Sequence, residues 1–77
     1  MWRRRTVMEI DGKMYVVDTA EIMKELGGKY ETMIFAAKKN GEIANPKELY
    51  CRTYTSERAA EAGHDQVVKD AGKLIQL

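Results

Sequence analysis

Two runs of β-forming residues near the N-terminus are separated by Asp11-Gly12. Residues 6–10 and 13–17 consist mainly of Val, Ile, Met, Tyr and Thr. Asp-Gly between two such runs predicts a type I′ hairpin turn, because that turn needs positive φ at both central positions. The two-residue loop sets the register and places Arg5 opposite Asp18, a charge pair worth about 0.2–1 kcal/mol.

Residues 19–26 fit two patterns. The apolar positions 22, 23 and 26 lie on one face of a short helix that Thr19 would cap and Gly27-Gly28 would end. Alternatively, the second strand continues through Thr19 and Glu21. The periodicity favours the helix, and both alternatives stay open.

The next two strands are predicted at residues 30–37 and 49–55. Asn40-Gly41 indicates a second hairpin turn, with Lys39 opposite Glu42 in a two-residue loop. Pro46 has no backbone donor, so we expect it to interrupt the pairing or to lie at an edge.

The pattern becomes helical after Ser56. Thr55 or Ser56 is the expected N-cap, and Glu57 suits the positive end of the helix dipole. One face with helical spacing is predicted to be buried, and it consists of Ala60, Gly63, His64, Val67 and Ala71. We expect the helix to approach the sheet closely at Gly63 and to end at Gly72. Residues 73–77 fit a helix end, an edge strand or a contact segment.

The elements together predict a single α+β domain over residues 1–77. It is an antiparallel four-stranded sheet of two hairpins with the C-terminal helix packed on one face.

Strand alternation provides the candidate docking surface. In the fourth strand Tyr50, Arg52 and Tyr54 share one side, whereas Cys51 and its neighbours at 49 and 53 share the other, which we expect beneath the helix. Tyr and Arg are enriched at the residues that dominate binding energy in protein interfaces.

The third strand is apolar on both sides, with Tyr30 and Ile34 on one side and Met33 and Phe35 on the other. Such a strand is normally covered on both faces. A single helix covers one face, so the second is closed by residues 19–26, by the tail or by another chain. The predicted partner-binding residues are Tyr50, Arg52, Tyr54, Tyr30 and Ile34.

Composition argues against several functional classes. The 77 residues are 44% hydrophobic and 32% charged with a net charge of +1, which is typical of a globular domain. His64 and Cys51 are the only histidine and cysteine. A nucleophile–base pair of these two is the one enzymatic arrangement, and a core thiol with a hydrogen-bonded imidazole is the simpler interpretation. We expect no enzyme activity, metal site or cofactor.

The segment Trp2, Arg3, Arg4 and Arg5 suggests nucleic-acid binding, with arginines on phosphates and the indole on a base. Lys38 and Lys39 would add to it. The acidic residues that follow dilute this positive charge.

The single cysteine fits a reducing compartment. No segment reaches the roughly 18 apolar residues of a membrane span, and the first residues are too polar for a signal-peptide core. We expect a cytoplasmic location in a host cell.

Residues 30–35, Tyr-Glu-Thr-Met-Ile-Phe, are followed by Tyr-Cys-Arg-Thr-Tyr-Thr-Ser-Glu at 50–57 and Ala-Gly-His at 62–64. Over about residues 30–68 the chain resembles a family of small proteins from tailed bacteriophages and prophages, with an "ETMVF" strand and an "RY-T-EEA-GH-V" strand-to-helix segment. In that family the stretch before "ETMVF" is more strand-like. The resemblance implies phage origin and an intracellular setting and brings no assigned activity or catalytic residues.

The resulting expectation is a non-enzymatic phage or prophage accessory protein that binds a host or phage protein, for example an anti-defence inhibitor such as an anti-CRISPR. A homodimer is a further expectation. The alternative is a small nucleic-acid-binding protein that uses the N-terminal arginines.

Overall fold

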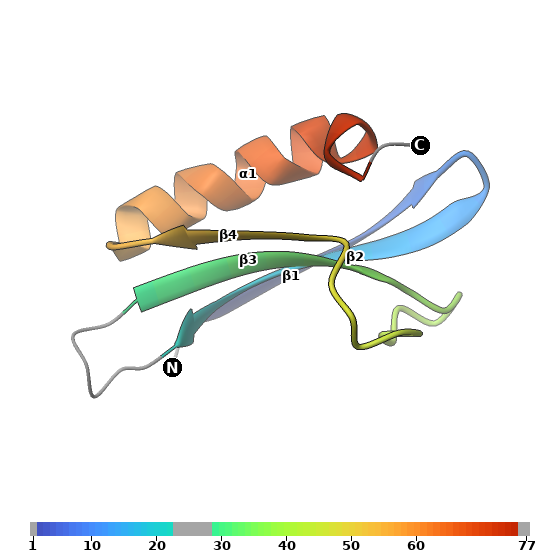
Figure 1. The fold of residues 1–77 in the computed structure, drawn as a ribbon, viewed down its shortest axis with the longest axis horizontal. Coiled ribbons are helices and arrows are strands. Elements are labelled where there is room, and N and C mark those ends of the chain that lie inside the picture. The colour runs from blue at the N-terminus through green and yellow to red at the C-terminus, as the bar shows by residue number, and fades with distance from the viewer. Residues whose placement is uncertain (1, 23–28, 76–77) are drawn as a thin grey trace.

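A computed structural model describes residues 2–22 and 29–75. Four antiparallel strands form one open sheet in the order β1-β2-β3-β4, and one C-terminal helix packs on it (Figure 1). The bounds are β1 Arg3–Ile10, β2 Lys13–Ile22, β3 Lys29–Ala36, β4 Tyr50–Tyr54 and α1 Glu57–Leu74. The predicted α+β fold is therefore confirmed.

The N-terminal hairpin has the predicted turn and register. Asp11 and Gly12 have φ values of 51° and 80°, as a type I′ turn requires. Arg5 pairs with Asp18, and its Nη2 donates a hydrogen bond of 3.0 Å to the Asp18 carboxylate.

The helix preferred for residues 19–26 is wrong as far as the structure describes that segment. β2 continues to Ile22, and Thr19 lies inside the sheet, fully buried and paired with Thr32. Pairing on both sides of β2 outweighs the weak helical periodicity. Residues 23–28, including Gly27-Gly28, lie outside the described residues.

The turn at Asn40-Gly41 is present, but its register differs by one residue. Lys38, rather than Lys39, faces Glu42, because the Lys38 N–H donates to the Glu42 carbonyl at 2.8 Å. Gly41 has a φ of 88°, and the pairing beyond the turn is a single bridge between Ala37 and Ile43. Residues 37–49 therefore form a long connection, which lies on the side of the sheet away from α1 (Figure 1).

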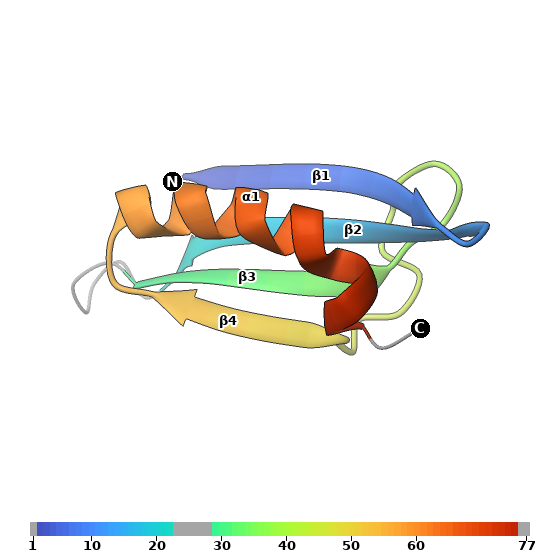
Figure 2. The same ribbon diagram turned by 90° about the horizontal axis from the view of Figure 1, so that it is seen from above.

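The helix begins as predicted and ends later than predicted. Ser56 is the N-cap, and its Oγ accepts a hydrogen bond of 3.1 Å from the Ala59 N–H. The helix continues past Gly72 to Leu74 and is capped at Ile75, so the predicted end at Gly72 is wrong. Figure 2 shows α1 crossing the sheet obliquely, from above β1 towards β4.

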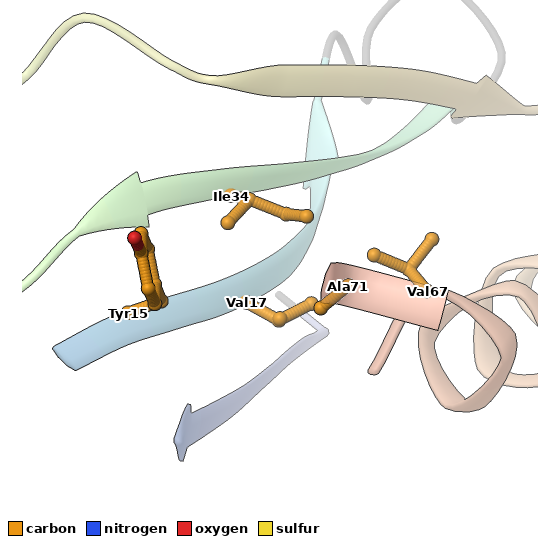
Figure 3. Packing of buried hydrophobic residues seen from close by; sticks show 5 residues of the cluster. All are labelled: Tyr15, Val17, Ile34, Val67 and Ala71. Carbon is orange, nitrogen blue, oxygen red and sulfur yellow. The ribbon is translucent and has the colours of Figure 1, made fainter. Parts of the chain in front are cut away.

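The core lies between α1 and one face of the sheet. Its central cluster comprises Tyr15, Val17, Ile34, Val67 and Ala71 (Figure 3). The predicted helix face is buried at all five positions. A Cβ at Gly63 would overlap the ring of Tyr54, so the absent side chain permits the close approach that the sequence indicates.

Candidate functional site

The predicted docking residues lie on the same side of the sheet as α1. Ile34 is 0% and Tyr54 8% exposed, and Tyr50 packs against the core cluster. The prediction that Tyr50, Arg52 and Tyr54 face away from the helix is therefore wrong. The ring of Tyr54 fits over Gly63, and this contact turns the even-numbered side of β4 towards the helix.

Tyr30 and Arg52 extend the packing at the end of the sheet near the start of α1. The Tyr30 ring meets the Trp2 indole edge-on with centroids 6.0 Å apart. Burial raises the pKa of Tyr30, with smaller contributions from Glu21 and Glu57. The exposed guanidinium of Arg52 lies 5.3 Å from the ring centroid of Tyr54.

The opposite face, called here the helix-free face, carries the odd-numbered residues of β1, β3 and β4 and the even-numbered residues of β2. Val7, Val16 and Phe35 form one row across it. Val16 is 0% and Phe35 8% exposed although neither faces α1. The 37–49 connection lies against this row, because a Cβ at Gly41 would lie 3.2 Å from the Val7 side chain, although Val7 is still 45% exposed.

A groove of about 290 Å³ lies beside this row on the helix-free face. Its apolar lining is Ala20, Ile22, Met33, Phe35 and Ile43. Its charged lining is Arg3, Arg5, Asp18 and Glu31. The groove therefore combines an apolar floor with a charged wall on β1 and with carboxylates on β2 and β3.

Both arginines on the β1 wall converge on Asp18. Arg5 Nη2 lies 3.0 Å from Asp18 Oδ2, and Arg3 Nε lies 3.4 Å from Oδ1. The Asp18 side chain is only 10% exposed, whereas those of Arg3 and Arg5 are 58% and 39% exposed. Asp18 Oδ1 accepts no hydrogen bond from the described residues. The cross-strand pair that the sequence predicts thus forms one wall of the groove.

Cys51 is exposed, so the predicted core thiol is wrong. Its Sγ donates a hydrogen bond of 3.2 Å to Glu31 Oε2 on the helix-free face. Partial burial, this bond and the charges of Glu31 and Glu48 raise the pKa of the Cys51 thiol to about 11. A thiol with so high a pKa is a poor nucleophile at neutral pH.

His64 lies on the other side of the sheet, fully buried beneath α1. Hydrogen bonds join its Nε2 to Thr6 Oγ1 at 2.8 Å and its Nδ1 to Thr19 Oγ1 at 2.6 Å. Thr19 Oγ1 is also 2.6 Å from Thr32 Oγ1. This His–Thr network matches the predicted hydrogen-bonded imidazole. The sheet separates His64 from Cys51, so the two do not form a nucleophile–base pair.

The candidate nucleic-acid residues are divided between the two faces. Arg4 points to the helix side, where its Nη2 lies 3.1 Å from Asp65 Oδ1. Trp2 packs on Tyr30 instead of standing free to stack on a base. Lys38 and Lys39 are exposed in the 37–49 connection. The structure therefore does not gather these groups on one surface.

In residues 2–22 and 29–75, no group of three His, Cys, Asp or Glu residues is arranged to hold a metal ion. Within the same ranges, no helix has the length and hydropathy needed to cross a bilayer.

Comparisons of the chain with protein-family models, with curated proteins and with solved structures find no match. The groove on the helix-free face is thus identified by its geometry alone.

Proposed function

We propose that this chain is a non-enzymatic accessory protein of phage or prophage origin that binds a host or phage protein through its helix-free face. The observation that carries the proposal is the groove on the helix-free face, which Ile43 of the 37–49 connection lines at one side. An apolar floor with arginine at the rim has the composition of protein–protein contact areas.

The size of the groove is sufficient for one or two side chains of a partner protein. Its volume of about 290 Å³ is at the lower end of small-molecule pockets, which span about 300–1,000 Å³. The surrounding face is a sheet surface, which suits a partner that spreads over it while one or two of its side chains enter the groove.

The phage or prophage origin rests on the sequence resemblance at residues 30–68, whereas the binding surface rests on the groove. Inhibition of a host enzyme or defence complex, as an anti-CRISPR does, is one form of the proposed activity, since it requires binding and no catalytic group. A second copy of the chain, which would give a homodimer, would compete for the same face.

Cys51 provides a test, because its exposed thiol lies on the helix-free face beside the groove residue Glu31. A benzophenone–maleimide attached there at alkaline pH would cross-link a protein docked on this face in a lysate of the bacterial host. We expect one discrete adduct that unlabelled protein competes away.

Two matched variants make the test specific. Met33→Glu places a charge in the groove and should abolish the adduct, whereas Arg58→Glu changes an exposed helix residue and should leave it intact. Circular dichroism would verify that both variants fold. An adduct equally strong in folded Met33→Glu protein would contradict the proposed surface.

A further inference from the structure

The β1 wall of the groove carries surplus positive charge. Arg3 and Arg5 share the single carboxylate of Asp18, and more than a third of each arginine side chain is exposed. A guanidinium has five N–H donors. The pair therefore presents several donors to solvent at the groove rim, arranged to bind an anionic oxygen.

Asp18 adds a requirement for a donor. Its side chain is nine-tenths buried, and its Oδ1 accepts no hydrogen bond from the described residues. Arg3 Nε lies 3.4 Å from this enclosed oxygen, so a ligand can supply a donor to it only when neighbouring side chains move aside. A peptide segment supplies both groups, since a main-chain N–H lies close to the carboxylate of an acidic side chain.

The remaining lining separates this ligand from a nucleic acid. The groove is lined by two arginines and two carboxylates, those of Asp18 and Glu31, so it has no net positive charge to hold a continuous phosphate backbone, whereas one carboxylate needs only the exposed donors of Arg3 and Arg5. Phe35 is the aromatic residue of the lining and is only 8% exposed, so it provides no stacking surface for a base. Ala20 and Met33 form a floor suited to an aliphatic side chain.

We propose that the groove binds a protein segment in which an acidic and an aliphatic side chain lie two residues apart in extended conformation. Arg3 and Arg5 bind the carboxylate, and the aliphatic side chain packs on Ala20 and Met33. In an extended segment, side chains i and i+2 point to the same side and lie about 7 Å apart. This distance falls between the separation of neighbouring strands and that of next-but-one strands in the sheet. This inference rests on the proposed function and specifies the partner's chemistry.

The test uses ¹⁵N-labelled protein and three blocked heptapeptides that differ at one position. The sequence is Gly-Ser-Leu-Thr-Xaa-Ser-Gly, with Glu, Gln or Lys as Xaa. The Glu peptide should shift the amide signals of residues 3–7, 16–22 and 31–35. The Gln peptide should bind about tenfold more weakly, the range expected when a charge-assisted hydrogen bond becomes a neutral one, and the Lys peptide should not bind.

Variants of Arg3, Arg4 and Arg5 distinguish a specific contact with the peptide from a general effect of positive charge. The double variant Arg3→Gln, Arg5→Gln should bind the Glu peptide no better than the Gln peptide. Arg4→Gln removes a charge from the same strand on the helix side and should leave binding unchanged. Amide spectra of the free variants verify the fold.

Three results would overturn the inference. One is that the Glu and Lys peptides bind equally well, or that neither of them binds. Another is a shift of the same signals when the protein alone is concentrated, which would show a second copy in the groove. The third is saturation of these signals by oligothymidine in a manner that depends on Arg3 and Arg5.

Failure of the inference can be distinguished from failure of the proposed function. If the Arg3→Gln, Arg5→Gln variant still forms the Cys51 adduct, the face binds a protein and the acidic chemistry of the partner is wrong. If the unsubstituted protein forms no adduct and binds no peptide, both proposals fail.

Discussion

The ring of Tyr54 occupies the space that a side chain at Gly63 would require. This contact fixes how closely α1 approaches β4 and which side of β4 faces the helix. Packing therefore requires a residue without a side chain at position 63, although glycine in the middle of a helix is otherwise less stable than alanine by about 0.5–1 kcal/mol.

Gly63→Ala should destabilise the protein by about 1–3 kcal/mol, because either the ring or the helix must move. Gly72→Ala is the matched control, since no atom lies within 4 Å of a Cβ at that helical position. It should raise stability by up to about 1 kcal/mol. Urea unfolding measures both changes, and an equal effect of the two substitutions would contradict the packing argument.

Thr19→Val should cost about 1–3 kcal/mol, because it removes the partner of both His64 Nδ1 and Thr32 Oγ1 while keeping the side-chain shape. Thr53→Val on exposed β4 is the control and should change the unfolding free energy by less than about 0.5 kcal/mol. If Thr19→Val were equally mild, the buried network would not contribute to stability.

Stability should fall when the pH is lowered below about 6.5. Burial lowers the pKa of His64 from its ordinary value of 6.5, and Arg4 lowers it further, against smaller opposing effects of Asp65 and Asp18. The unfolded chain takes up a proton near 6.5, but the folded protein does so only at lower pH. The contribution is thus complete above 6.5 and is lost as the pH falls towards the folded pKa.

The unfolding free energy measured in urea over a pH series tests this prediction. His64 is the only histidine, so few other groups titrate between about pH 5 and 7. His64→Gln should flatten the profile in that window. A slope that persists in the His64→Gln variant would assign the effect to another group.

Alkylation of Cys51 by iodoacetamide should be slow at neutral pH. A pKa raised from 9.0 to about 11 leaves about a hundredfold less thiolate. Glu31→Gln removes the acceptor and its charge and should speed the reaction, whereas Glu48→Gln should have a smaller effect. Equal rates for the Glu31→Gln and unsubstituted proteins would indicate that the Cys51–Glu31 bond does not form in solution.

Ser56→Ala should destabilise α1 by about 0.5–2 kcal/mol through loss of the N-cap bond to the Ala59 N–H. The adjacent exposed Thr55 was the sequence's alternative cap, and Thr55→Ala should have little effect. Thermal unfolding of the two variants compares them directly. A larger loss of stability for Thr55→Ala would show that Thr55, and not Ser56, is the N-cap.

The parts of the fold that depend on local chemistry could be predicted from the sequence. The Asp11-Gly12 turn fixes its own geometry and, through it, the pairing of Arg5 with Asp18. The buried face of α1 follows from its helical spacing. These features need only residues that are neighbours in the chain or directly across one turn.

The side of β4 that faces the helix could not be predicted in the same way. Alternation separates Tyr50, Arg52 and Tyr54 from Cys51 but does not say which set is buried. That choice depends on Gly63 receiving the ring of Tyr54, a contact between two different elements. The sequence pattern therefore gave the right grouping with the wrong orientation.

The groove was not predicted from the sequence. The Arg5–Asp18 pair and the apolar residues Met33 and Phe35 were visible in the sequence. The extent of the open area was not, because it depends on where the 37–49 connection lies and on the contact of Gly41 with Val7. The residues of a long connection say little about the path that it takes over the rest of the fold.

The hydrogen bonds of His64 also bear on how the protein folds during synthesis. Thr6, Thr19 and Thr32 leave the ribosome well before His64, yet their hydroxyls face the surface that later becomes the core. Until the segment with His64 emerges, Thr19 and Thr32 have only each other and water as hydrogen-bond partners here, and Thr6 has only water. A chain truncated before His64 should therefore stay incompletely ordered.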